Sequence, residues 1–216
     1  MDSKNKQDLK KNSPYSASMT GCGFVFSDFT SLVPLMLEPN ANLLIQDEIR
    51  NNNLLMMNSE LTRKRAMSEL QKRFNAVLRN FWEYYLALND DDKHIALLYP
   101  ILQAYAVAKD LHQKVVISQW HSAGQSIDND MLMMELYNLS AQDPFVDSWS
   151  EATKKKIASW YLTILVQVGM LDRINQKLKP VHLYDCSWFA QQNEEWFLEA
   201  CLLDSQDIFQ MVQPYK

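Results

Sequence analysis

Apolar residues along most of this chain recur at intervals of three and four, which is the spacing of one face of an α-helix. The longest such run begins at Ser59. Arg65, Lys72 and Arg79 lie seven residues apart within it and fall on the face opposite the apolar stripe. The pattern predicts one long helix with a buried face and a basic face, and its apolar stripe consists of Met67, Leu70, Phe74, Val77, Leu78 and Phe81.

Shorter segments carry the same helical signal, so an all-α fold is expected. Turn residues are scarce, with four glycines and seven prolines in 216 residues, which also favours helices. Asn89 and the aspartates that follow it are typical of a helix start, and Pro100 predicts a kink in the apolar helix beyond. Residues 115–117 are β-branched but have no partner strand nearby, so we expect a helix there as well. The remaining expected helices cover 27–37, 43–51, 95–109, 128–139 and 187–203.

The segment 143–183 has the order of elements found in a winged helix-turn-helix. Proline disfavours helix in the residue before it, so Asp143-Pro144 is a candidate domain boundary. A helix then begins at Ser148-x-x-Glu151, which is a capping-box pattern with Ser150 as a competing cap. Gly169 can end this helix in the left-handed conformation. The partly alternating residues after Gly169 predict a short basic hairpin.

These patterns together predict a compact multi-helical protein with a tail and two parts. Residues 1–14 contain four lysines and no apolar core, so we expect a disordered tail rather than a secretory signal. Residues 15–143 would form an N-terminal helical domain, and residues 144–216 a C-terminal helical domain similar to a helix-turn-helix or a winged helix. No apolar run approaches the roughly 20 residues of a membrane span. We therefore expect a cytoplasmic protein without membrane contact.

Composition limits the chemistry that this chain can perform. A formal net charge of -5 argues against a protein that coats nucleic acid with its whole surface, although local basic patches can still bind it. The three cysteines have no Cys-x-x-Cys spacing and the four histidines have no i, i+4 partner, so neither a disulfide frame nor a metal site is expected. Phosphate-binding loops and nucleophile motifs are lacking too. We expect a non-enzymatic protein without a cofactor.

Two clusters of basic residues are the candidate functional features. Between Ser59 and Arg79 six basic residues are accompanied only by Glu60 and Glu69, which is poor charge mixing for an ordinary solvated helix face. The lysines of the second cluster begin near the positive end of a helix dipole, where cations are mildly unfavourable. Both clusters suit the repeating charges of nucleic-acid phosphates. The first consists of Arg63, Lys64, Arg65, Lys72, Arg73 and Arg79, and the second of Lys154, Lys155 and Lys156 with Arg173, Lys177 and Lys179 on the expected hairpin.

Several motifs resemble the BrxA family, the small accessory proteins of bacteriophage exclusion (BREX) defence systems. The most specific motif is Trp149-Ser150-Glu151-Ala152-Thr153-Lys154-Lys155-Lys156-Ile157 with Val168-Gly169-Met170-Leu171. The segments around Tyr15-Ser16-Ala17-Ser18, Gly23-Phe24-Val25-Phe26 and Ser59-Glu60-Leu61-Thr62-Arg63-Lys64-Arg65 are similar as well. The resemblance implies an all-helical protein with a NusB-like first part that binds double-stranded DNA. The positions that it assigns to DNA binding are Arg63, Arg65, Ser150, Thr153, Lys154 and Lys155.

The sequence thus favours a double-stranded-DNA-binding accessory protein of antiphage defence that contacts phosphates through two basic helices. One alternative is an assembly factor that holds the defence methyltransferase, or another BREX component, through residues 131–139 and the aromatic C-terminal helix. A NusB-like fold also leaves RNA as an alternative ligand.

Overall fold

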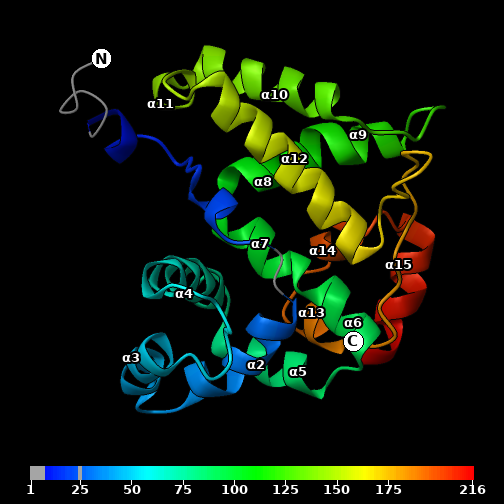
Figure 1. The fold of residues 1–216 in the computed structure, drawn as a ribbon. Coiled ribbons are helices and arrows are strands. Elements are labelled where there is room, and N and C mark those ends of the chain that lie inside the picture. The colour runs from blue at the N-terminus through cyan, green and yellow to red at the C-terminus, as the bar shows by residue number, and fades with distance from the viewer. Residues whose placement is uncertain (1–7, 24–25) are drawn as a thin grey trace.

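The computed structural model describes residues 8–23 and 26–216, and all of the regular structure in this part of the chain is helical (Figure 1). The all-α fold class is therefore confirmed. Half of the expected 1–14 tail lies outside the described residues, and residues 8–11 of it are helical. The elements are η1 (Ser18–Gly21), α2 (Phe26–Leu37), α3 (Ala41–Asn51), α4 (Glu60–Asn75), α5 (Arg79–Ala87), α6 (Asp90–Ala96), α7 (Leu98–Ala104), α8 (Ala106–Leu111), the π-helical η2 (His112–Val116), α9 (Ile117–Trp120), α10 (Asn129–Gln142), α11 (Pro144–Asp147), α12 (Glu151–Val168), α13 (Ser187–Gln191), α14 (Trp196–Ala200), α15 (Ser205–Val212) and η3 (Gln213–Tyr215).

The long helix expected from Ser59 to Phe81 is wrong, because the chain breaks between α4 and α5. Leu78 adopts an extended conformation and is 59% exposed. The Trp82 indole N–H donates to the carbonyl of Phe74, 3.0 Å away, near the C-terminal end of α4. This bond lets α5 leave in a new direction and bury its own aromatic residues. Arg79 consequently does not share a helix with Arg65 and Lys72.

The apolar segment 95–109 is also divided, at the places where its backbone cannot continue a helix. Pro100 lacks the N–H that would bond to the carbonyl of Ala96, and α6 ends at that residue. The predicted kink is thus present at Leu97. A second break follows at Tyr105, which has an extended backbone. Residues 98–102 are nevertheless all buried, as expected for a central helix.

The prediction of a single C-terminal helix over 187–203 is wrong, because this segment forms the two short helices α13 and α14. Asn193 and Leu202 have φ values of 57° and 64°, which interrupt the helical backbone. These helices return to the centre of the protein, where Trp188 packs edge-on against Phe81 at a ring distance of 5.0 Å. The predicted segments 15–143 and 144–216 therefore contribute to one hydrophobic core.

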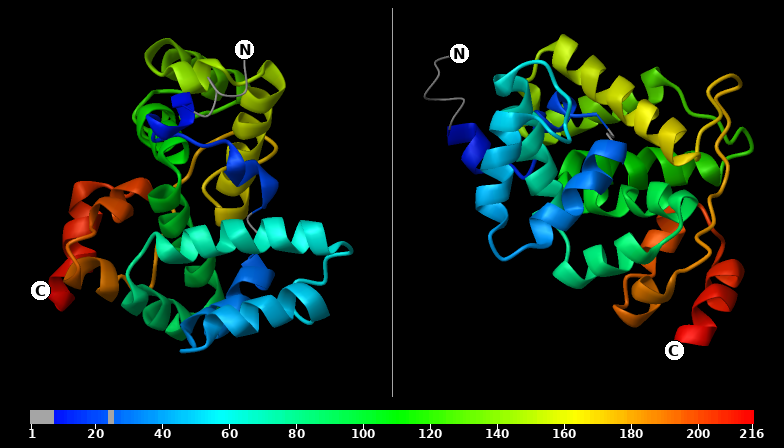
Figure 2. Two further views of the ribbon diagram at one scale, coloured as in Figure 1. Left: turned by 90° about the vertical axis from the view of Figure 1, so that its left-hand side faces the viewer. Right: turned by 60° about the horizontal axis from the view of Figure 1, so that its bottom comes forward.

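Helices α3 and α4 lie on one side of the molecule and α13 to α15 on the other (Figures 1 and 2). Helix α12 lies beside α10 in the upper part of the view in Figure 1 and packs against α10, α6 and η1, while η1 also packs against α4. The single turn η1 therefore lies between the two helices that carry the predicted basic clusters.

Candidate nucleic-acid interface

Both ends of α12 are set by local sequence signals. Ser150 caps the helix and accepts a hydrogen bond from the Thr153 N–H, so the competing cap is used and the expected Ser148 capping box is wrong. Ser148 instead donates its hydroxyl hydrogen to the Phe145 carbonyl. Gly169 ends the helix with φ 87°, in the left-handed conformation that was predicted. Because Ser150 and Thr153 also bond to each other through their hydroxyls at 2.9 Å, their first role is to start the helix.

The first lysine of α12 points inward. Lys154 is 4% exposed, and its Nζ lies 3.7 Å from a carboxylate oxygen of Glu151 and 5.5 Å from the ring centre of Tyr137. The Tyr137 hydroxyl donates to the same carboxylate at 2.7 Å. Lys154 therefore joins α12 to α10, which does not agree with its predicted place on a DNA-binding surface. Lys155 and Lys156 are exposed.

Two arginines of the first cluster are buried as well. Arg63 is 8% exposed, and its guanidinium donates to the carbonyls of Ile49 and Met57 at 2.6 and 2.8 Å. These bonds satisfy carbonyls near the end of α3 and in the loop that leads to α4. Arg73 is fully buried, and its guanidinium donates to the Cys22 carbonyl at 3.3 Å. Both arginines hold chain segments together and are not available to phosphates.

Two exposed cations of α4 line a hollow beside η1. Lys64 and Arg65 are exposed, and Lys64 forms an ion pair with Glu60 at 2.5 Å. Lys72 is half-buried, its Nζ lies 4.5 Å from the centre of the Tyr105 ring, and burial lowers its pKa. The hollow has a volume of about 370 Å³ and is lined by Ser18, Gly21, Lys64, Arg65, Ser68 and Glu69.

One carbonyl connects the two basic helices below this surface. The Cys22 carbonyl accepts hydrogen bonds from Arg73 of α4 and from the Trp160 indole of α12, the latter at 3.0 Å. Glu69 accepts from the hydroxyls of Ser18 and Tyr105 at 3.1 and 2.8 Å, so its carboxylate in the hollow already has two donors. No local pattern in the sequence predicts these bonds, because their partners are distant along the chain.

The remaining predicted residues lie elsewhere. Arg79 is exposed but donates to the Leu37 carbonyl at the end of α2. The expected hairpin after Gly169 is a tight loop with two isolated antiparallel bridges, and no strand is assigned in the described part of the chain. Lys177 donates from its ammonium group to the Gly124 carbonyl, whereas Lys179 is exposed.

The described residues contain no group of three or more potential metal ligands, and none of their helices is long and apolar enough to cross a membrane.

Residues 13–186 match the sequence model of the BrxA family. A crystal structure of an uncharacterized protein from Magnetospirillum magneticum superposes with a TM-score of 0.75 at 21% identity, over 88% of this chain and 98% of that chain. This similarity shows a shared fold. No curated protein matches the sequence.

Proposed function

Because this chain belongs to the BrxA family, we propose that it is a non-enzymatic, double-stranded-DNA-binding accessory protein of a BREX system. Membership places the chain among the accessory proteins of BREX phage defence. DNA binding is our own proposal, and it concerns the cations that the fold leaves exposed. It does not include the cations that the fold has buried.

The observation that carries the proposal is the basic rim of the hollow between η1 and α4. Lys64 and Arg65 border a concave surface that also presents the hydroxyls of Ser18 and Ser68. Ammonium, guanidinium and hydroxyl groups are the donors that proteins use most often toward phosphate oxygens. Arg65 is not part of any ion pair found among the described residues. Its guanidinium is therefore available for a phosphate.

Lys155 and Lys156 provide a second group of exposed cations on the neighbouring helix. They follow the capped start of α12, where the helix dipole adds positive potential that favours an anion. Because η1 packs against both α4 and α12, we propose that one duplex backbone reaches cations of both helices. This arrangement offers donors to phosphates rather than a helix that enters the major groove, so we expect binding with little sequence preference.

The expected salt dependence follows from the number of exposed cations. Three to five phosphate contacts, from the exposed Lys64, Arg65, Lys155 and Lys156 and the half-buried Lys72, would give a slope of about -2.7 to -4.5 for log K against log salt concentration. Affinity would then fall about 40- to 500-fold between 50 and 200 mM salt. The test is a titration of labelled duplex DNA, single-stranded DNA and RNA over this range.

Charge reversal at two exposed positions makes the test specific. We expect Arg65→Glu and Lys155→Glu each to weaken duplex binding by about tenfold and to reduce the salt slope by about 1 to 2. The matched control is Lys216→Glu, an exposed lysine that pairs with Glu195 near the C-terminus. Binding that does not change with salt, or reversed variants that bind like the parent, would contradict the proposal. Stronger binding of RNA than of duplex DNA would favour the RNA alternative.

The assembly alternative is supported by one feature of α10. Met134 is 67% exposed on this helix, and Tyr137 is 47% exposed although its hydroxyl and ring contact Glu151 and Lys154 of α12, so both offer apolar surface to a partner. The alternative predicts that Met134→Glu abolishes association with a BREX partner but leaves DNA affinity unchanged. Loss of DNA binding in this variant would argue against it.

A further inference from the structure

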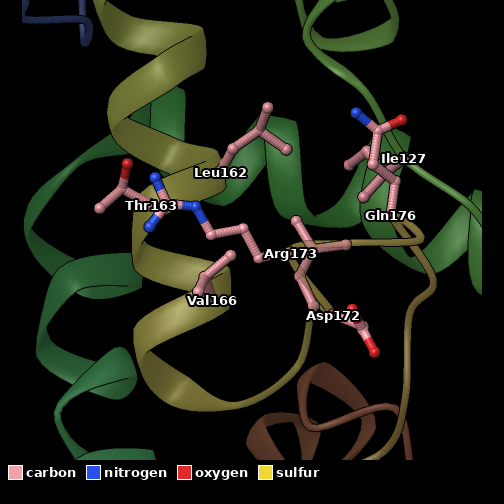
Figure 3. A pocket seen from close by; sticks show the side chains of 8 residues that line it. Ile127, Leu162, Thr163, Val166, Asp172, Arg173 and Gln176 are labelled. Atoms are coloured by element: carbon pink, nitrogen blue, oxygen red, sulfur yellow. The ribbon is translucent and has the colours of Figure 1, made fainter.

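A pocket of about 250 Å³ lies between α12 and the loop that follows it (Figure 3). Half of its lining residues are aliphatic, the other half are polar or charged, and none is aromatic. Leu162 and Val166 come from α12, Leu171 from the start of the loop, and Ile127 from the segment before α10. A concave surface that combines aliphatic side chains with a few polar groups is the usual form of a binding site.

Arg173 gives this pocket a cationic edge. In Figure 3 its side chain reaches from the loop across to α12 and ends beside Thr163. None of the ion pairs and hydrogen bonds found in the described part of the chain involves its guanidinium. The neighbouring Asp172 does not neutralise it, because its carboxylate points away and accepts from the Ile174 N–H at 2.8 Å. A carboxylate at this edge would find an available donor.

The pocket is formed before any ligand binds. The Ile127 N–H donates to the Gln176 carbonyl at 3.1 Å, and the Leu178 N–H donates to the Gln125 carbonyl at 2.8 Å. The Asp172 N–H closes the loop by donating to the Lys177 carbonyl. These bonds fix the position of the loop against the segment before α10. A ligand would therefore bind without the cost of ordering its site.

We propose that this pocket docks a segment of a partner protein in which an aliphatic side chain lies next to a carboxylate. The aliphatic side chain would enter the pocket and the carboxylate would pair with Arg173. Aliphatic walls fit such a side chain, whereas a nucleobase would be expected to stack on an aromatic ring. The volume is also below the roughly 300–1,000 Å³ of most small-molecule sites.

The surroundings of the pocket favour a protein over a free small acid. Ile174 lies at the tip of the loop and is 96% exposed, outside the pocket itself. A small molecule in the pocket would leave this side chain in water, but a partner surface would cover it. Lys179 is exposed on the same loop and adds a second positive charge to it. An aliphatic anchor surrounded by complementary charges is the usual organisation of a protein interface.

The test uses a peptide blocked at both ends with a central leucine between two glutamates, titrated into protein with methyl-labelled isoleucine, leucine and valine. We expect chemical-shift changes at the methyl groups of Ile127, Leu162, Val166 and Leu171. Replacing the two glutamates with glutamine, or Arg173→Gln in the protein, should each weaken binding by about tenfold. Val166→Trp should block the pocket, and Gln167→Trp, an exposed neighbour on α12, is its matched control.

Three outcomes would overturn the proposal. The first is that the peptide shifts none of these signals at millimolar concentration. The second is that N-acetyl-leucine binds while the blocked peptide does not, which would indicate a small-molecule site. The third is that duplex DNA shifts the same methyl groups and Val166→Trp weakens DNA binding. Because Val166→Trp is expected to leave DNA affinity unchanged, this inference can fail or succeed independently of the proposed DNA-binding function.

Discussion

The neutral His112 in the centre of the fold predicts a specific loss of stability in acid. His112 is 1% exposed and begins the π-helical turn η2. Its Nε2 lies 2.8 Å from the Ala200 carbonyl and must donate to it, so Nδ1 accepts from the Tyr161 hydroxyl at 2.6 Å. Both ring nitrogens are therefore satisfied in the neutral form. Burial lowers the pKa of His112 from 6.5 to about 4.

The direction and size of the effect follow from linkage. Between pH 6.5 and pH 4 the unfolded chain binds the His112 proton and the folded chain does not, so the free energy of unfolding falls as the pH falls. A difference of about 2.5 pKa units corresponds to a total of about 3 kcal/mol. Most of it, about 2 kcal/mol, is lost between pH 7.5 and pH 5.0. Above pH 7 the contribution is complete and no longer changes.

The assay is urea denaturation of the parent and of His112→Gln at pH 7.5 and pH 5.0. Gln cannot be protonated, so its variant should be less stable at pH 7.5 but should lose about 2 kcal/mol less than the parent on going to pH 5.0. Comparing the two proteins removes the contribution of all other titrating groups. If the parent and the variant lose equal stability, to within about 0.5 kcal/mol, His112 is not held neutral and the reasoning is refuted.

The remaining predictions test where the fold places its charges and its left-handed glycine. Arg73→Met should lower the free energy of unfolding by about 2 to 3 kcal/mol in urea denaturation, because the buried Cys22 carbonyl loses a charged donor. A nearly unchanged free energy of unfolding would contradict the structural role of Arg73. Lys154→Ala should reduce the melting temperature and leave DNA affinity intact. Lys155→Ala should instead weaken DNA binding and leave the melting temperature unchanged. Equal behaviour of the two variants would contradict the buried position of Lys154 and the exposed position of Lys155. Gly169→Ala should cost about 1 kcal/mol because φ is 87° there, while Gly21→Ala, with no atom near the added carbon, should change stability by less than about 0.5 kcal/mol.

Local signals in the sequence indicated several helix ends, although at α12 they offered two caps, of which Ser150 is used and Ser148 is not. Ser150 caps α12, Asn89 caps α6 and Asp128 caps α10, each through a hydrogen bond to a backbone N–H three residues later. Gly169 ends α12 because glycine adopts a positive φ without steric cost. These ends could be predicted because they depend on residues within one helical turn.

Helix breaks that depend on distant packing could not be predicted in this way. The apolar spacing of three and four continues through Leu78, yet the chain turns there because Trp82 bonds to Phe74 and joins the aromatic core. The break within 187–203 likewise depends on Asn193 and Leu202, whose backbones adopt the left-handed conformation. Neither residue is a glycine, so the sequence does not indicate a positive φ at these positions. In both places tertiary packing is stronger than local helical propensity.

The buried cations show how the candidate site could have been predicted better. Lys154 lies three, four and seven residues before buried positions of α12, and Arg63 lies four residues before the buried Met67. Both therefore fall on the inward faces of their helices, a fact that the sequence already contained. Grouping cations by their proximity along the chain placed these residues on the DNA surface, whereas grouping them by helix face would have placed them inside.

The buried and exposed cations of α4 and α12 have different roles in one arrangement. Arg73 and Trp160 donate to the same Cys22 carbonyl, so both helices are attached to the chain segment next to η1. Arg65 and Lys155, on the outer faces of these helices, are then carried on elements that cannot move apart without breaking a buried bond. A duplex that contacts both would meet preorganised charges, which lowers the cost of binding. It follows that Trp160→Phe, which removes one of the two donors and no charge, should weaken DNA binding if the relative position of the helices matters. It should leave the salt slope unchanged, because the number of exposed cations stays the same.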